Sequence, residues 1–302
     1  MKIGIVGSGA IGLYYGARLA RSGEDVHFLA RSDFDSIKEN GIEVKLAKDS
    51  FVVNPVPVYD NVEAMGVCDL VIVGLKTTAN QNLPSLLDPL VGENTRILTL
   101  QNGLGSDSLI AERYGAAKVL GALCFVCLNR IAPGCVENTH LGSLAMGNYR
   151  RPADDFAKEL GAKFKKAGIR CSVVDDLQLT QWKKLVWNIP FNGLAIAAGG
   201  VTTDVIMGDE GLQELAGELM EEIIAGAVAL GMTMDSKMIA TQMKVTLGMK
   251  AYKPSSLIDF MDGKPVEVES IWGEAYRQGK DAGVDMPRLG MLYRLLSALC
   301  EK

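Results

Sequence analysis

The chain of 302 residues is 48% hydrophobic and 22% charged, with a formal net charge of −5 at pH 7. This balance is typical of a globular protein, excludes a disordered chain and argues against a nucleic-acid partner. The longest apolar run, residues 119–128, falls far short of the roughly 20 residues that span a bilayer. Strand-like sequence begins at Ile3, which leaves no room for a signal peptide, so we expect a cytoplasmic protein without a membrane partner.

Short β-rich runs alternate with helical patterns in the first half, which predicts a doubly wound parallel sheet of the Rossmann type. We expect strands at 2–7, 25–30, 69–75, 95–101, 118–126 and 170–175, and helices at 10–22, 78–90, 106–114 and 153–168. Two extended pieces at 42–46 and 51–58 are expected near a sheet edge because of Pro55 and Pro57. Residues 134–147 are expected to form strand and turn.

The second half of the sequence loses this alternation and shows long patterns of helical period. We expect helices at 177–197, 208–231, 235–248, 265–282 and 287–300. The sequence therefore predicts an α/β domain over residues 1–176 and an all-α domain over residues 177–302. Amphipathic helices in the second domain allow a homodimer.

Six cysteines are scattered along the chain, which favours reduced thiols over a disulfide scaffold. Cys124 and Cys127 form a C-x-x-C inside an apolar, strand-like stretch. Alternation along a strand places these two residues on opposite faces, so a structural role is favoured over a metal or redox site. We expect no metal.

The clearest motif is Gly7-Ser8-Gly9-Ala10-Ile11-Gly12, which matches G-x-G-x-x-G between a predicted strand and a predicted helix. The first glycine permits a tight turn, the second admits a pyrophosphate close to the backbone, and the third allows tight packing of helix on strand. The helix N-terminus adds free N–H groups and about half a positive charge. This context favours a dinucleotide site over a purely structural glycine turn.

Arg31 follows the second predicted strand, where sites that prefer NAD usually place Asp or Glu. A guanidinium at this position suits the 2′-phosphate of NADP(H). The alternative is a solvated arginine. Lys76 and Asn102 follow two other predicted strands, where ligands of open α/β sheets collect, although a loop lysine and an Asn-Gly turn are also ordinary.

Reduction of a carbonyl by hydride leaves an alkoxide that needs a proton. The two histidines are poorly placed for this, His27 inside a strand and His140 in a turn-rich segment. Lys184, Asn188 and Asn192 are four residues apart and therefore share one face of an apolar helix. Desolvation lowers the pKa of a buried lysine, which suits proton donation, and Pro190 is expected to disturb the helix locally.

The chain resembles the ketopantoate reductase (2-dehydropantoate 2-reductase) family over essentially its full length. The resemblance is carried by the glycine motif, Arg31, Lys76, Gln101-Asn102-Gly103, the string W-K-K-L-x-x-N-x-x-x-N and the block from Pro254 to Glu269. The resemblance implies NADPH-dependent reduction of ketopantoate to pantoate, toward pantothenate and coenzyme A. Lys184 would then donate the proton and Asn102 would touch cofactor and substrate.

The resemblance also implies roles for other residues. Asn188 and Asn192 would bind the hydroxyl end of the substrate and Ser255 its carboxylate, while Glu267 would contact the cofactor. Lys76 and Arg31 would hold the adenosine phosphates. Ser255 as an ordinary helix N-cap remains an alternative. At the level of function, reduction of another branched 2-oxo acid and a non-catalytic NADP sensor also stay open.

Overall fold

The computed structural model describes residues 1–300, except for the side chains of His140 and Leu141. Two compact units are distinguished. The sheet unit comprises Met1–Asn102 and Ser106–Leu177, and the helical unit comprises Gly103–Gly105 and the residues from Gln178 onward.

The centre of the sheet unit is parallel. β1 (Lys2–Val6) lies between β2 (Asp25–Leu29) and β6 (Cys68–Val73), and β7 (Val91–Thr99) follows beside β6. β5 (Val58–Tyr59) pairs in parallel with β2 at one edge of the sheet. The four inner strands lie close to the predicted positions because their apolar runs are buried on both faces.

The other half of the sheet departs from the parallel pattern. β8 (Val119–Ala132) runs parallel to β7 but turns back into β9 (Cys135–Asn148) as a long antiparallel hairpin. The connection between them is too short for a parallel crossover, and the strand and turn expected within 134–147 are present as the turn that ends at Gly134 and the strand β9. β3 (Ile42–Leu46) and β10 (Arg170–Val173) both pair with β9 in parallel.

The excursion around the two prolines reaches both sheet edges. β4 (Phe51–Val53) pairs with β3 at the edge opposite to β5, and Pro55 and Pro57 lie between these two edge strands. The edge position expected from these prolines is therefore confirmed. A proline has no N–H to donate to a central ladder, which is the physical reason.

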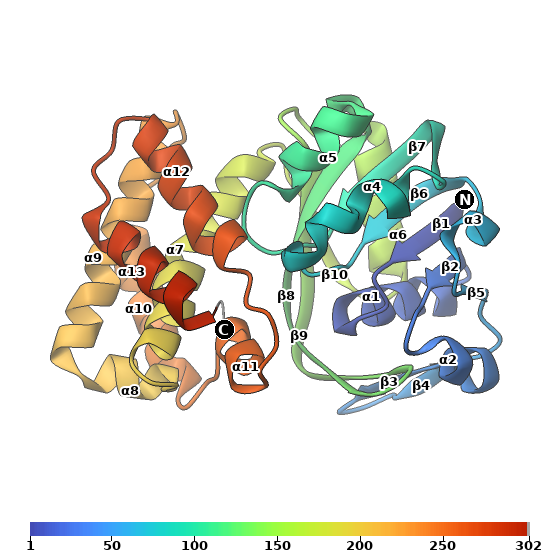
Figure 1. Ribbon diagram of the computed structural model, residues 1–302, viewed down its shortest axis with the longest axis horizontal. Helices are drawn as coiled ribbons and strands as arrows, with labels where there is room; N and C mark the ends of the chain where they lie inside the picture. Colours follow the sequence, from blue (N-terminus) through green and yellow to red (C-terminus); the bar gives the residue numbers. More distant parts are fainter. Residues whose placement is uncertain (301–302) are drawn as a thin grey trace. The chain divides into compact units, whose positions relative to one another are not determined.

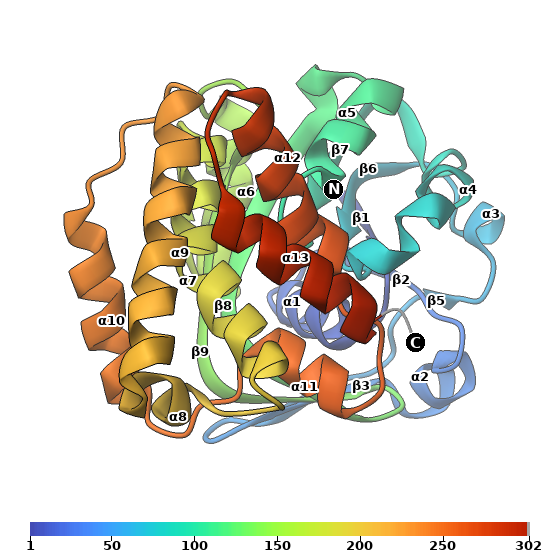
Figure 2. The same cartoon turned by 60° about the vertical axis from the view of Figure 1, so that its left-hand side comes forward.

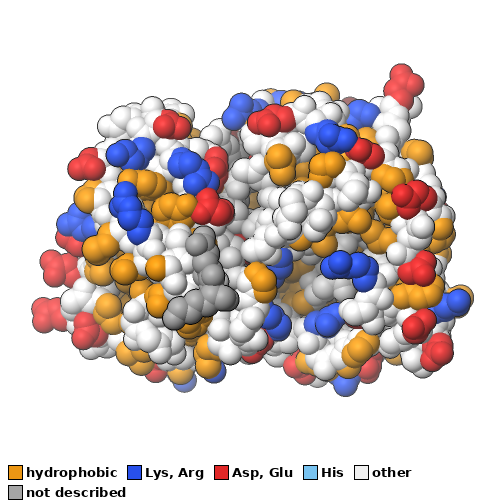
Figure 3. Space-filling model, viewed as in Figure 1, with side chains coloured by type: hydrophobic (Ala, Val, Ile, Leu, Met, Phe, Trp, Pro, Cys, Tyr) orange, Lys and Arg blue, Asp and Glu red, His pale blue; other side chains and the backbone are white. Residues whose placement is uncertain are grey.

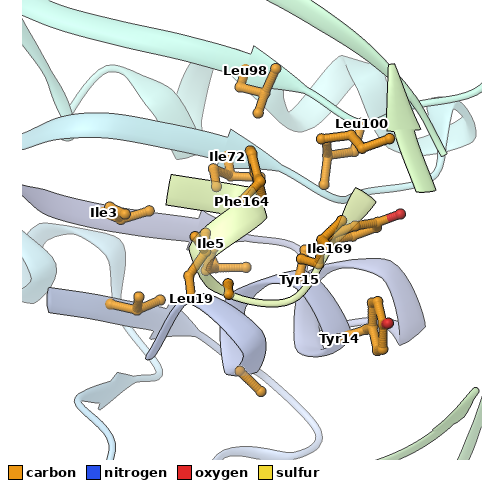
Figure 4. Packing of buried hydrophobic residues seen from close by; sticks show 14 of the residues in the cluster. Ile3, Ile5, Tyr14, Tyr15, Leu19, Ile72, Leu98, Leu100, Phe164 and Ile169 are labelled. Carbon is orange, nitrogen blue, oxygen red and sulfur yellow. The ribbon is translucent and has the colours of Figure 1, made fainter. Parts of the chain in front are cut away.

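Helices cover both faces of the sheet (Figure 1). α1 (Ala10–Arg21) and α6 (Asp155–Lys166) pack on one face, where Ile5, Leu19 and Phe164 are fully buried (Figure 4). The opposite face is covered by α3 (Val62–Met65), α4 (Leu83–Leu87) and α5 (Ser106–Tyr114).

Three shorter elements complete the sheet unit: α2 (Phe34–Asn40), the 3₁₀ turn η1 (Thr77–Asn82) and the 3₁₀ turn η2 (Ala116–Lys118). The helix predicted at 78–90 is instead η1 followed by the short helix α4. Pro84 lies in the first turn of α4, where its missing N–H is tolerated and a new helix can begin.

The helical unit contains the following elements: α7 (Leu177–Ala197), α8 (Thr203–Gly208), α9 (Glu210–Ala229), α10 (Lys237–Met249), α11 (Ser255–Met261), the π-helical turn η3 (Glu269–Gly273), α12 (Glu274–Asp281) and α13 (Pro287–Cys300). The predicted helices at 177–197 and 287–300 are confirmed. The prediction for 265–282 is wrong at its start, because Pro265 and its neighbours are not helical and lead into η3.

α9 is the central packing element of the helical unit and contacts α8, α10, α12 and α13 (Figure 2). Trp182, Phe191 and Trp272 are fully buried in the core of this unit. Acidic and basic side chains are interspersed on the face of it seen in Figure 3. None of the described helices is long and apolar enough to cross a membrane. The mostly parallel α/β sheet followed by a helical region confirms the predicted fold class.

Candidate functional site

Four predicted elements come together along one edge of the sheet. The strands neighbour each other in the order β7, β6, β1, β2, and all are parallel. Their carboxyl ends lead into Asn102, Lys76, the glycine motif Gly7–Gly12 and Arg31, respectively. Because parallel strands end at the same edge, the structure collects these residues where ligands of open α/β sheets bind.

The three motif glycines meet three different steric conditions. Gly7 has φ +99°, a conformation that a residue with a Cβ adopts only with strain. A Cβ added to Gly12 would lie 2.1 Å from the carbonyl oxygen of Gly7, so only glycine lets α1 pack this closely. A Cβ added to Gly9 would meet no described atom within 4 Å. Steric crowding by the chain thus explains Gly7 and Gly12, whereas Gly9 leaves space open beside the backbone.

The N-terminus of α1 fits the pyrophosphate of a dinucleotide. Gly9 is the N-cap, and because it has no side chain it makes no side-chain cap on this helix. The first N–H groups of a helix have no acceptor within the helix and attract an anion. The Ser8 hydroxyl instead donates to the carbonyl oxygen of Leu29 over 2.6 Å, which ties the motif loop to the end of β2. Arg31, two residues further on, is exposed.

A chain of side-chain hydrogen bonds joins the loops after β6 and β7. The Gln101 amide donates to Asn80 Oδ1 over 2.7 Å, and the Asn80 amide donates to the Ser106 hydroxyl over 3.1 Å. The Thr99 hydroxyl donates to Gln101 Oε1 over 3.0 Å. This network links η1, which begins after Lys76, to the residue before Asn102. It was not predicted, because a sequence does not reveal which amides meet across neighbouring strands.

In the helical unit, α7 carries the predicted polar face. Asn188 and Asn192 are 9% and 1% exposed, and Lys184 is partly buried, whereas the neighbouring Lys183 is exposed. The helix continues through Pro190, and the carbonyl of Ile189 accepts a hydrogen bond from the Trp272 indole over 3.0 Å. A lysine aligned with two buried amides is therefore a built feature of this helix rather than a solvent-facing stripe.

Asn192 is engaged by the backbone at both ends of its amide. Its Nδ2 donates to the carbonyl oxygen of Asn188 over 3.0 Å, and its Oδ1 accepts from the Ser256 N–H over 2.9 Å. The second bond anchors the first turn of α11, which begins at the exposed Ser255. Pro254 occupies the N-cap position, so Ser255 is not the N-cap of this helix. The contact of Asn192 with substrate stays a prediction.

Glu267 is 5% exposed and lies two residues before the start of η3. The tripeptide Gly103–Gly105 belongs to the same unit and packs against η3, where the Leu104 N–H donates to the carbonyl oxygen of Ser270 over 2.8 Å. Gly103 has φ +80°, and a Cβ there would lie 2.2 Å from that same oxygen. The peptide bond after Asn102 is therefore one of the points at which the chain passes between the two units, the other two being the bonds before Ser106 and after Leu177.

The histidines and cysteines show no catalytic arrangement in the described part of the chain. His27 contacts Asp25 and Tyr59 through its two ring nitrogens, and the side chain of His140 lies outside the described residues. The described cysteines are free thiols, and no group of three metal-binding side chains occurs among the described residues. Burial raises the pKa of the Cys171 thiol to about 11, which makes it a poor nucleophile at neutral pH.

Comparison with known proteins gives a consistent result. Two family models match, described as Ketopantoate reductase PanE/ApbA over residues 3–151 and Ketopantoate reductase PanE/ApbA C terminal over residues 176–300. A curated 2-dehydropantoate 2-reductase of Nostoc sp. is 38% identical over 99% of this chain and 95% of its own length.

The solved structures agree. The crystal structure of 2-dehydropantoate 2-reductase from Geobacter metallireducens superposes with a TM-score of 0.95 at 41% identity, covering 99% of both chains. The ternary structure of D-mandelate dehydrogenase with NADH and anilino(oxo)acetate has a TM-score of 0.91 at 22% identity, covering 100% of this chain and 99% of that one. The second likeness shows the fold alone. With matches of this extent over both units, the chain belongs to the ketopantoate reductase family.

Proposed function

We propose that this protein reduces 2-dehydropantoate to pantoate with NADPH, and that Lys184 donates the proton. The observation that carries the proposal is the polar face of α7, where Lys184 is aligned with the buried Asn188 and Asn192 in a member of this family. A half-buried ammonium beside amides is suited to a carbonyl oxygen that gains negative charge during reduction.

The sheet edge supports a dinucleotide as cofactor. The first turn of α1 and the open space at Gly9 would receive the pyrophosphate, and Lys76 would add positive charge near the phosphates. When bound, the reduced nicotinamide supplies the hydride. Arg31 supports NADPH, because an exposed guanidinium after β2 suits a 2′-phosphate better than a 2′-hydroxyl.

The remaining predicted residues would bind and orient the substrate and the cofactor. Asn102, held in place through Gln101, would contact both molecules, and the buried Glu267 would contact the cofactor. Asn188 would bind the hydroxyl end of the substrate, and Ser255 its carboxylate. Asn192 would contribute at least by positioning Ser256, because its Oδ1 accepts a hydrogen bond from the Ser256 N–H.

Further parts of the proposal concern organisation. Residues 1–176 would act as the dinucleotide-binding domain and residues 177–302 as the domain for substrate binding and dimerisation. We also propose that the enzyme works in the cytoplasm and that the helical domain supports a homodimer.

A substrate panel tests the proposal directly. Oxidation of NADPH is measured with ketopantoate and, separately, with 2-oxoisovalerate, which lacks the hydroxymethyl end. We expect a clearly higher kcat/KM for ketopantoate. Equal values for the two acids would favour the rival function, reduction of another branched 2-oxo acid, and no turnover with either would favour a non-catalytic sensor.

A further inference from the structure

Asp33 is the first acidic residue after the end of β2, and the structure buries it. It follows Arg31 and Ser32 directly, and its side chain is 2% exposed. A carboxylate near the end of this strand is the group that accepts from the ribose hydroxyls of NAD and that repels a 2′-phosphate. How this carboxylate is held therefore bears on which dinucleotide binds.

Both oxygens of Asp33 are occupied by other parts of the sheet unit. Arg130 Nη1 donates to Oδ1 over 2.7 Å, and the Gly134 N–H donates to Oδ2 over 3.0 Å. The Ser32 hydroxyl donates to Oδ1 over 2.7 Å. The carboxylate is thus paired with one positive charge and turned into the protein.

The groups that hold Asp33 come from a distant part of the sequence. Arg130 lies in β8, 97 positions after Asp33, and Gly134 lies in the connection from β8 to β9. The same connection accepts a hydrogen bond at the Pro133 carbonyl from the Ser36 hydroxyl of α2 over 3.1 Å. The β8–β9 hairpin therefore fixes the segment that begins with Arg31.

We propose that Arg130 is a positioning residue that sets the dinucleotide preference by sequestering Asp33. With Arg130 present, the negative charge of Asp33 is paired and Arg31 remains the charge that meets the 2′-phosphate. Without Arg130, a carboxylate two residues from Arg31 would lose its cation and would either pair with Arg31 or face the phosphate. This inference rests on the NADPH part of the proposed function.

Direct binding of the two dinucleotides tests the inference. NADPH and NADH are titrated by fluorescence, without any 2-oxo acid, into the wild type and the variants Arg130→Met, Arg130→Lys, Asp33→Asn and Asp33→Asn/Arg130→Met. In Arg130→Met we expect NADPH affinity to fall about tenfold and NADH affinity to change less than about twofold, because only NADPH carries the opposing charge.

The double variant and a matched control sharpen the test. Asp33→Asn/Arg130→Met has no carboxylate to release, so its ratio of NADPH affinity to NADH affinity should return close to the wild-type ratio. Arg130→Lys keeps a positive charge and should retain most of the wild-type preference for NADPH. Arg113→Met removes another arginine ion pair, the exposed pair with Asp88, and should leave the ratio unchanged. Thermal unfolding of each variant verifies that it is folded.

Two results would overturn the inference. An equal loss of both dinucleotides in Arg130→Met would mean that the hairpin only stabilises the segment, and a low ratio in the double variant would mean that Arg130 binds the phosphate itself. The ratio of NADPH affinity to NADH affinity in the wild type tests the NADPH proposal. A wild-type protein without a preference for NADPH would contradict both that proposal and the inferred role of Arg130. Turnover of ketopantoate can fail independently, because no substrate is present in these titrations.

Discussion

The sheet edge and the polar face of α7 are built in different ways. At the sheet edge, the main features are those of the backbone. Gly7 and Gly12 are required by steric contacts of the chain, and the first turn of α1 offers N–H groups. On α7, the polar face consists of side chains, and one of them, Asn192, accepts a hydrogen bond from the backbone of another helix. A site formed by the backbone tolerates few residue types at its glycine positions, whereas a site formed by side chains depends on the neighbouring groups that hold those side chains in place.

The largest expected effect separates chemistry from cofactor binding. Lys184→Ala should lower kcat at least roughly a hundredfold, the lower end for loss of general acid assistance, while leaving NADPH affinity nearly unchanged. Steady-state kinetics and a binding titration measure the two quantities. Lys183→Ala is the matched control, because Lys183 is exposed. Unchanged kcat in Lys184→Ala would remove this lysine from the mechanism.

Substitutions of two motif glycines should affect different quantities, stability for Gly12 and cofactor affinity for Gly9. Gly12→Ala places a Cβ 2.1 Å from the Gly7 carbonyl oxygen and should lower the free energy of unfolding by about 1–3 kcal/mol. Gly9→Ala meets open space and should alter stability by less than about 1 kcal/mol, yet weaken NADPH binding roughly tenfold. Denaturant unfolding and titration distinguish them; normal cofactor affinity in Gly9→Ala would argue against a close approach there.

On the side of α7, Asn192→Ala should act first on stability. The change leaves the Ser256 N–H without its acceptor in a buried position, which should lower the free energy of unfolding by about 2 kcal/mol. Urea denaturation measures this, with the exposed Asn94→Ala as control. A variant with unaltered stability but a strongly raised KM for ketopantoate would mean that Asn192 acts by contact with substrate alone.

Arg31→Ala tests the side-chain part of the sheet edge. Loss of one charge-assisted contact to a 2′-phosphate should reduce the preference for NADPH over NADH about tenfold, equivalent to about 1.4 kcal/mol. The ratio of kcat/KM values for the two dinucleotides measures it. If the ratio did not change, Arg31 would be only a solvated residue.

The smallest effect concerns a carboxylate of the sheet unit away from this edge. Asp154 caps α6 through the Ala157 N–H and pairs with Arg96 over 3.0 Å. Burial alone would raise the pKa of Asp154, but the bonds from Ala157 and Arg96 outweigh it and hold this pKa at about 2. A lowered pKa in the folded state means stability that is present above the ordinary value near 3.8 and lost as the pH falls toward 2.

Asp154→Asn keeps the cap and removes the charge, so it should lower the free energy of unfolding by about 1 kcal/mol at neutral pH. This difference should shrink between about pH 4 and pH 2, as the wild-type carboxylate becomes protonated. Unfolding curves at several pH values measure it, and Asp155→Asn, 95% exposed at the side chain, is the control. A difference independent of pH would contradict the assigned role of the charge.

Strong local patterns made much of the fold predictable. The inner strands carry continuous apolar runs, and α7 and α13 have clear helical periods. The glycine motif places Gly7 in a turn, Gly9 at the N-cap of α1 and Gly12 inside α1. The elements that were missed, such as α2 and the division of residues 78–90 into η1 and α4, are short. Their few residues carry too little periodicity to be distinguished from loop.

Residues near one another in the chain were enough to predict the α/β order, the dinucleotide motif and the lysine and asparagine face of α7. The contacts between distant groups became evident only from the folded chain. The hairpin bond from Arg130 to Asp33 and the anchoring of Ser256 by Asn192 span 97 and 64 positions. Such contacts arise from sheet order and helix packing, which local spacing does not specify.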